Sequence, residues 1–249
     1  MHPSAALLAL APGLALGSFL NVVAARLPRG GSLVRPGSSC IACRAPIAWY
    51  DNVPLVSYLA LRGRCRSCGA RIGLRYPAVE LVTGALIATC FLLFGFALEA
   101  LVAAFFCAVL VAVSAIDVEH RIIPNAIVVP ATAVVLVANT LLEPSLEWTV
   151  AALGCSAFLF VAVLAYPAGM GMGDVKLALL LGAALGRTAP VALMFGMLAA
   201  LVPAIFLFAR HGRAARKMAI PFGPFLALGG VVALFLGDRV LDLYLETWS

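Results

Sequence analysis

The sequence predicts an all-α polytopic membrane protein with about eight transmembrane helices and one small polar domain. Of its 249 residues, 64% are hydrophobic and only 11% are charged, whereas a soluble domain is about half apolar and about a quarter charged. Apolar runs of membrane length recur along most of the chain. One polar segment, residues 27–76, interrupts them. Lipid is therefore the solvent that this composition fits.

The apolar runs are continuous rather than alternating, which predicts helices and not barrel strands. About 20 residues, at about 1.5 Å each, cross a hydrocarbon layer of about 30 Å. The runs cover residues 5–25, 77–97, 98–116, 123–142, 148–166, 175–186, 189–209 and 221–237. The run at 175–186 is short, so we expect a half-length or tilted helix, or one that continues through Arg187. The first run follows no basic region and is expected to remain as a permanent helix.

The charged residues of the connections predict the orientation. Lys and Arg concentrate in residues 26–76 and 210–217. Six of the eleven acidic residues fall in the other connections and in the tail: Glu99, Glu143, Glu147, Asp238, Asp242 and Glu246. With eight helices, the positive-inside rule puts both basic segments in the cytoplasm and the N-terminus on the outer side of the membrane. The net charge of +6 is then a topology signal, and no nucleic-acid partner is expected.

Three parts follow from this pattern: a first transmembrane helix (1–26), a cytoplasmic domain (27–76) and a transmembrane core (77–249). A domain of about fifty residues buries little core and usually needs a crosslink or metal. Small-residue pairs four apart occur in the helical runs, and they favour close helix packing in lipid. They are Gly13 with Gly17 and Gly182 with Gly186.

The cytoplasmic domain carries two CxxC pairs, separated by 21 residues: Cys40, Cys43, Cys65 and Cys68. Two such turns can complete a tetrahedral four-thiolate zinc site, which is structural because it leaves no open coordination position. Gly69 follows the second pair, and such turns favour a glycine at this position. Two disulfides are the alternative, although they seldom persist in a reducing cytosol. The other cysteines lie in apolar runs and are expected to be small buried residues: Cys90, Cys107 and Cys155.

Two aspartates lie at the edges of apolar runs, where an ionisable group is costly. Asp117 ends the run at 98–116 and precedes Glu119, His120 and Arg121. One interpretation is an interfacial charge cluster that ends a helix. The other interpretation is a functional carboxylate, because Asp117 is flush with the apolar run.

Asp174 follows three alternating glycines, Gly169, Gly171 and Gly173. Taken alone, Asp174 would be interpreted as a helix N-cap. The glycines would let a substrate strand approach Gly171 and Gly173 closely. Lys176 is expected either to tune the charge of Asp174 and contact substrate or to snorkel to the interface.

The predicted topology puts Asp117 and Asp174 at one depth, on the cytoplasmic edge. Two carboxylates in one partly dry site share a proton and titrate as a coupled pair. One can take a proton from water while the other polarises a scissile carbonyl, which is the arrangement of an aspartic protease.

At these residues the sequence resembles the bacterial type IV prepilin leader peptidases that are also N-methyltransferases. The resemblance runs through nearly the whole chain. It is carried by Gly17–Val23, Arg26–Pro28, the two CxxC pairs, Asp51–Pro54, Arg75–Glu80, the Asp117 segment with Ile123–Asn125, Gly171–Lys176 and Pro221–Phe225. The joint order of these motifs is specific, although each alone is weak.

The resemblance implies a function. It assigns the catalytic pair to Asp117 and Asp174, the latter within a GxGD motif. The implied substrates are prepilins or type II secretion pseudopilins, cut on the cytoplasmic side after the glycine that ends a short basic leader. The new N-terminus would then be methylated with S-adenosylmethionine.

Four polar residues have two interpretations. Asp51 and Asn52 are candidates for the methyl-donor site by resemblance only, and a capping turn is the alternative. Asn21 and Glu80 either line the site or cap helices.

Two other functions compete with the peptidase. A proton-coupled transporter also uses intramembrane carboxylates and glycine-broken helices, but its polar groups would lie near the bilayer midplane. A membrane-anchored zinc-ribbon module that only binds partners would not need the aspartates.

Overall fold

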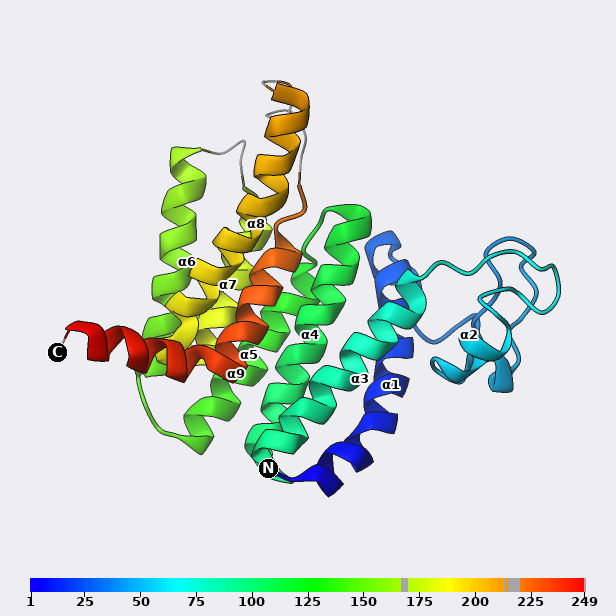
Figure 1. The fold of residues 1–249 in the computed structure, drawn as a ribbon, viewed down its shortest axis with the longest axis horizontal. Coiled ribbons are helices and arrows are strands. Elements are labelled where there is room, and N and C mark those ends of the chain that lie inside the picture. Colours follow the sequence, from blue (N-terminus) through cyan, green and yellow to red (C-terminus); the bar gives the residue numbers. More distant parts are fainter. Residues whose placement is uncertain (167–169, 213, 215–219, 249) are drawn as a thin grey trace. The chain divides into compact units, whose positions relative to one another are not determined.

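The computed structural model describes residues 1–166, 170–212, 214 and 220–248, and it confirms the all-helical class (Figure 1). Within these residues there is no β-strand, only two isolated bridges, Ser39 with Pro46 and Arg64 with Arg71. The α-helices are α1 (Pro3–Arg26), α2 (Val56–Ala60), α3 (Arg75–Phe94), α4 (Leu98–His120), α5 (Asn125–Leu142), α6 (Glu147–Ala165), α7 (Met172–Leu185), α8 (Ala189–His211) and α9 (Gly223–Trp248). The short 3₁₀ helices are η1 (Leu27–Arg29), η2 (Trp49–Asn52) and η3 (Gly186–Thr188).

Each predicted apolar run forms a helix, and seven segments of the described chain are long and apolar enough to span a membrane. The difference from eight arises at α7, whose 14 residues extend only about 21 Å at the rise of an α-helix. Residues Met172–His211, which contain α7, η3 and α8, count as one of the seven segments. The chain is therefore a multi-pass membrane protein, and α7 is the short helix that the sequence predicts.

Two helix ends differ from the prediction. The second long helix ends at Phe94, because Gly95 adopts a left-handed φ of 67°. The last helix does not end near residue 237 but continues to Trp248. The acids predicted for a C-terminal tail, Asp238 and Asp242 among them, therefore lie on α9.

The chain forms two compact units, Met1–Ala115 and Ile116–Ser249. In the first unit, α1 packs closely against α3. A Cβ atom on Gly17 would lie 2.6 Å from the Cα of Glu80, and one on Gly13 would lie 3.0 Å from the Cα of Gly84. Neither position can carry a side chain at this spacing. The predicted close packing at Gly13 and Gly17 is confirmed.

In the second unit, α7 is the buried helix. Leu177, Ala178, Leu180 and Leu181 are each 0% exposed. Gly182 of α7 packs against the backbone of Ala151 and Ala152 on α6. The side-chain amide of Asn139 on α5 donates to the carbonyl of Ala183 at 3.0 Å. These contacts fix the helix that carries Asp174.

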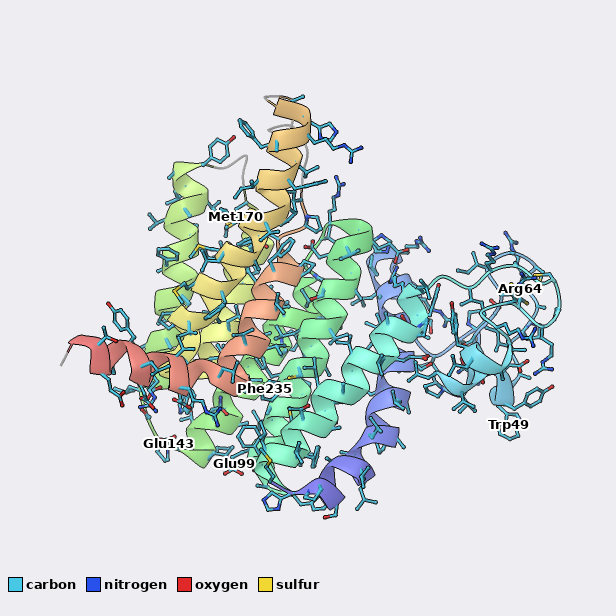
Figure 2. All side chains as sticks on the ribbon, viewed as in Figure 1. Trp49, Arg64, Glu99, Glu143, Met170 and Phe235 are labelled. Atoms are coloured by element: carbon cyan, nitrogen blue, oxygen red, sulfur yellow. The ribbon has the colours of Figure 1, made fainter. Side chains whose placement is uncertain are left out.

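The segment between α1 and α3 contains little regular structure, as the glycines and prolines predict. Figure 2 shows Trp49 and Arg64 at the surface of this segment, and Trp49 is 82% exposed. Glu80 of α3 accepts a hydrogen bond of 2.9 Å from the backbone N–H of Leu55. This bond ties the polar segment to a membrane helix of the same unit.

Candidate active site and metal centre

Asp117 lies in the last turn of α4, which continues to His120, and it is only 5% exposed. The backbone N–H of Gly223, the first residue of α9, donates to Oδ2 of Asp117 at 2.9 Å. A Cβ atom on Gly223 would lie 2.9 Å from the same oxygen. Only a glycine therefore lets the start of α9 approach this carboxylate undisturbed.

Asp174 lies in the first turn of α7 and is 7% exposed. It is not the N-cap, a position that Gly171 occupies, but the third helical residue. Its Oδ2 accepts a hydrogen bond of 3.0 Å from the backbone N–H of Gly171, in the manner of a capping box. The structure thus fixes the carboxylate on the side of the helix that faces back toward the glycines.

Both aspartates line one cavity of about 400 Å³. The three residues predicted to contact substrate, Gly171, Gly173 and Lys176, line the same cavity, as does Asn125. The remaining lining comes from Arg121, Ile122, Ile123, Met172, Pro221 and Phe222. Apart from the two carboxylates, the charged groups of this lining are the side chains of Arg121 and Lys176.

The two glycines of the motif differ in their surroundings. A Cβ atom on Gly173 would lie 2.8 Å from the Cβ of Ile123, in the connection between α4 and α5. A Cβ atom on Gly171 would meet nothing closer than 3.7 Å, and its backbone angles, φ −95° and ψ 158°, are open to any residue. Close packing therefore requires a glycine at residue 173 only.

Lys176 reaches across to the start of α5. Its Nζ donates to Oδ1 of Asn125 at 2.8 Å. The predicted neighbour of the site, Gly169, lies outside the described residues, as do Arg213, Arg216 and Lys217 of the basic segment.

Each of the two carboxylates is held by a hydrogen bond from a glycine. Within the described chain, each accepts its side-chain hydrogen bond through Oδ2, from a glycine N–H. Two buried carboxylates that line one cavity favour a state in which one of them carries a proton.

The role of Gly223 was missed by reasoning from the sequence. The segment Pro221–Phe225 contributes to the family resemblance, but it suggested no contact with Asp117. The signal present was the glycine between two prolines at a helix start, and a local pattern does not identify a partner 106 residues away.

The four predicted metal ligands come together in the first unit. The Sγ atoms of Cys40, Cys43, Cys65 and Cys68 all lie within 4.8 Å of one another. The Sγ atoms of Cys40 and Cys68 are 3.8 Å apart, which matches the about 3.8 Å between sulfurs on a tetrahedral zinc with Zn–S bonds of about 2.3 Å. This cluster can hold a metal ion such as zinc.

The two CxxC turns share one backbone design. Cys40 N–H donates to the carbonyl of Ala45, and Cys65 N–H donates to that of Ala70, at 2.9 and 2.8 Å. The fourth residue after each first cysteine is left-handed: Arg44 has φ 58° and Gly69 has φ 71°. Gly69 was predicted to favour this turn, whereas Arg44 adopts the same conformation without being a glycine.

Backbone donors in the first turn favour a thiolate. The N–H groups of Cys43 and Ala42 lower the pKa of Cys40 to about 6. A thiolate is the form of cysteine that binds metal. Hydrogen bonds with the thiols of Cys43, Cys65 and Cys40 raise the pKa of Cys68 to about 11, so within the cluster the negative charge is favoured on Cys40.

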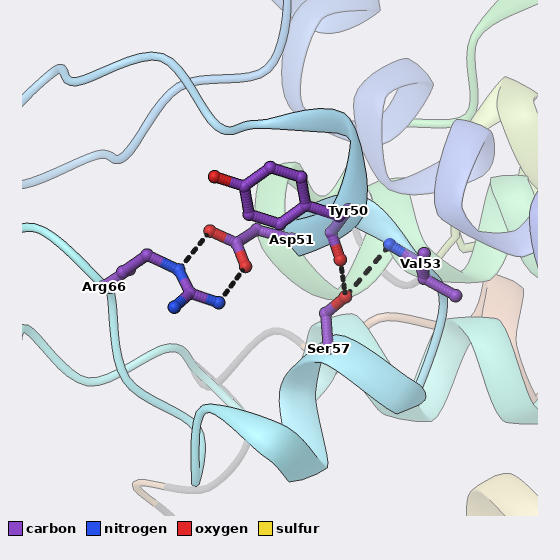
Figure 3. A network of polar contacts seen from close by, with 5 residues as sticks. All are labelled: Tyr50, Asp51, Val53, Ser57 and Arg66. Carbon is purple, nitrogen blue, oxygen red and sulfur yellow. Dashed lines mark hydrogen bonds and ion pairs between the residues drawn. The ribbon is translucent and has the colours of Figure 1, made fainter.

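A polar network braces the metal-site domain (Figure 3). Arg66 forms a two-point ion pair with Asp51, with N–O distances of 2.7 and 2.6 Å. Its guanidinium lies 5.6 Å from the ring centroid of Tyr50. Ser57 accepts from the N–H of Val53 and donates to the carbonyl of Tyr50. The ion pair with Arg66 lowers the pKa of Asp51.

The other three cysteines and Asn21 lie on membrane helices. Cys90, Cys107 and Cys155 are buried, as predicted. Asn21 donates through its side-chain amide to the carbonyl of Tyr76 at 3.0 Å, which joins α1 to α3.

Taken together, the second unit places a buried carboxylate pair on a cavity at the ends of membrane helices, and the first unit carries a four-cysteine cluster. This defines the class as a polytopic helical membrane protein with a candidate aspartic active site. Two family models match the chain. The Bacterial Peptidase A24 N-terminal domain matches residues 12–94, and the Type IV leader peptidase family matches residues 104–208.

Three curated relatives match over nearly their whole length. The chain is 36% identical to a prepilin leader peptidase/N-methyltransferase of Bacillus subtilis over 239 residues, covering 94% of this chain and 95% of the relative. It is 36% identical over 277 residues to the protein of that description from Pseudomonas aeruginosa, covering 98% and 95%. It is 34% identical over 273 residues to that from Neisseria gonorrhoeae, covering 96% and 93%. No solved structure matches the chain. The chain belongs to the type IV leader peptidase family.

Proposed function

We propose that this chain is an aspartic endopeptidase that removes the leader of type IV prepilins or pseudopilins. The observation that carries the proposal is the placement of Asp117 and Asp174 on one cavity, each with one oxygen held by a glycine N–H. The names of the curated relatives supply the substrate class. The fold alone would not identify a substrate.

The proposed mechanism uses the pair in two protonation states. The ionised carboxylate accepts a proton from a water molecule, which then attacks the scissile carbonyl carbon. The protonated carboxylate donates a hydrogen bond to the carbonyl oxygen, where negative charge develops. A proton then passes to the leaving amine, and the C–N bond breaks. This series of steps needs no covalent intermediate.

The glycines and Lys176 are proposed to contact the substrate at the cavity. The backbone N–H and carbonyl of Gly171 are both used by Asp174. A substrate main chain is therefore proposed to lie against Gly171 and Gly173 without pairing with Gly171 as a strand edge. Lys176 lines the same cavity.

We further propose that the cavity opens on the cytoplasmic side of the bacterial inner membrane, with the N-terminus in the periplasm. Nine arginines in residues 26–76 support this orientation through the positive-inside rule. A prepilin held as a membrane helix with a cytoplasmic leader would present its cleavage site there. The cut follows the glycine that ends the leader.

The chain is also proposed to methylate the new N-terminus with S-adenosylmethionine. The names of the curated relatives support this second activity. We propose the polar domain, residues 27–76, as a zinc-binding unit that is separate from the peptidase core, residues 77–249. A zinc ion on Cys40, Cys43, Cys65 and Cys68 would crosslink this domain and take no part in the peptidase chemistry.

One experiment tests both activities. Purified protein in lipid is incubated with a prepilin and a labelled methyl donor, and leader loss and label transfer are scored separately. The proposal predicts cleavage after the glycine and label on the mature pilin. Absence of cleavage under conditions in which a curated relative cleaves the same substrate would contradict it.

A further inference from the structure

The connection between α4 and α5 is held against the start of α7 by two contacts. The first is steric, because Ile123 occupies the space where a Cβ atom of Gly173 would be. The second is polar, because Nζ of Lys176 donates to Oδ1 of Asn125 at 2.8 Å. Asp117 lies one turn before this connection, and Asp174 lies between Gly173 and Lys176.

The connection itself is tightly turned. Arg121 has a left-handed φ of 54°, which is uncommon for a residue with a side chain. Its N–H donates to the carbonyl of Asp117 at 2.8 Å. Any movement of the connection is therefore transmitted to the turn that carries the Asp117 carboxylate.

We propose that Lys176 and Asn125 form a clasp that sets the spacing of the Asp117 and Asp174 carboxylates, and that both are positioning residues. The proposal rests on the peptidase function proposed above. The clasp acts between the elements that carry the two aspartates, since Asn125 begins α5 directly after the connection from α4 and Lys176 follows Asp174 on α7. It matters because a displacement of about 1 Å in a catalytic group can cost roughly 100-fold in rate.

The spacing of two coupled carboxylates has a direct kinetic signature. Activity requires one protonated and one ionised group, so kcat/KM is bell-shaped with pH. The closer the carboxylates lie, the more the first ionisation opposes the second, and the wider the bell becomes. The charged groups that line the cavity are the two aspartates, Arg121 and Lys176. A change at Asn125 leaves all of these charges in place.

The test compares prepilin cleavage by the wild type, Asn125→Ala, Lys176→Met and Lys176→Arg. We expect Asn125→Ala to lower kcat by roughly ten-fold, a typical effect of one lost hydrogen bond to a charged group. We also expect it to narrow the pH profile of kcat/KM. Lys176→Met should narrow the bell and also move both limbs to higher pH, because a nearby cation is lost. Lys176→Arg should retain most of the wild-type width. The double variant Asn125→Ala/Lys176→Met should narrow the bell no further than Lys176→Met alone, since the two residues act through one bond.

Asn139→Ala is the matched control. It also removes a hydrogen bond between α5 and α7, but one that ends on Ala183 near the other end of α7. It should lower thermal stability and leave the width of the bell unchanged. An unchanged width in Asn125→Ala, or equal narrowing in Asn139→Ala, would overturn the clasp. If the wild type does not cleave at all, the proposed function fails and not the clasp.

Discussion

The backbone N–H of Gly223 donates to Oδ2 of Asp117 at 2.9 Å, and a methyl group on Gly223 would lie at that same distance from the oxygen. The first residue of α9 thus supports the carboxylate. It must be a glycine, because any side chain at this position would clash with the carboxylate. Asp174 has a similar donor in Gly171, but from its own helix start. The two carboxylates are therefore oriented by different elements.

Gly223→Ala is expected to displace the Asp117 carboxylate. Its added methyl group would be too close to Oδ2, so either the side chain of Asp117 rotates or α9 shifts. Leader cleavage should fall by roughly 100-fold, in line with a displacement of about 1 Å. A prepilin cleavage assay with purified variants measures this.

Gly154→Ala is the matched control for that change, because a Cβ atom on Gly154 of α6 would meet nothing within 4 Å. It should keep wild-type cleavage and raise helix stability by about 0.5–1 kcal/mol. Wild-type cleavage by Gly223→Ala would show that the contact with Asp117 does not matter.

Gly171→Ala and Gly173→Ala should have opposite outcomes. Residue 171 has open space and ordinary backbone angles, so alanine keeps its N–H bond to Asp174 and cleavage should stay within about three-fold of wild type. Alanine at residue 173 would press on Ile123, and cleavage should fall by roughly ten-fold or more. Initial rates on one prepilin at matched protein levels measure the difference. Equal loss in both variants would instead indicate that the substrate needs the empty space beside residue 171.

Cys65→Ser is expected to release zinc and open residues 27–76 while the membrane helices remain inserted. Three thiolates hold the ion more weakly than four, and this small domain depends on its crosslink. Metal analysis of purified protein should give one zinc in the wild type and much less in the variant, and limited proteolysis should cut the variant first between α1 and α3. Cys155→Ser is the control with an unchanged metal content. Wild-type protein without zinc would reject the metal site.

Asp51→Asn should make residues 27–76 more susceptible to proteolysis. The rate of proteolysis should exceed that of the wild type by the same factor at every pH from about 5 to 8. Arg66 lowers the pKa of Asp51, so the carboxylate is ionised throughout this range, which lies above its usual pKa of about 3.9. The stabilising effect of a lowered pKa is present above the unfolded value and is lost only as pH falls through the folded value. The ratio of cleavage rates of variant and wild type, measured at several pH values, tests this. A ratio that already declines between about pH 7 and pH 5 would mean that Asp51 titrates in that range.

The helical framework was predictable because only helices and closed barrels can span a lipid bilayer. Continuous apolar runs of spanning length leave only helices, and even the shortness of α7 is visible in the sequence. The end of α9 was not predictable, because Asp238 and Asp242 look like a polar tail, whereas a helix can carry acids once it leaves the apolar layer.

The two carboxylates of the candidate site were predictable, but the groups that hold them were not. Buried carboxylates at helix ends are costly, and this marked Asp117 and Asp174 for attention. The partners that hold them are backbone groups and small residues, which carry no local signal. The contact of Gly173 with Ile123 joins segments 50 residues apart, and only the fold brings them together. The left-handed turn at Arg44 was equally hidden, because the residue expected there is glycine.

The most direct test of the account is cleavage of a prepilin by Asp117→Asn and Asp174→Asn, with methylation of an already processed pilin measured on the same preparations. Each variant keeps the size and the hydrogen-bond acceptor of the side chain but cannot take part in the proton exchange. The account predicts that both lose leader cleavage and that both still methylate the processed pilin, which shows that they are folded. Leader cleavage at the wild-type rate by either variant would contradict it.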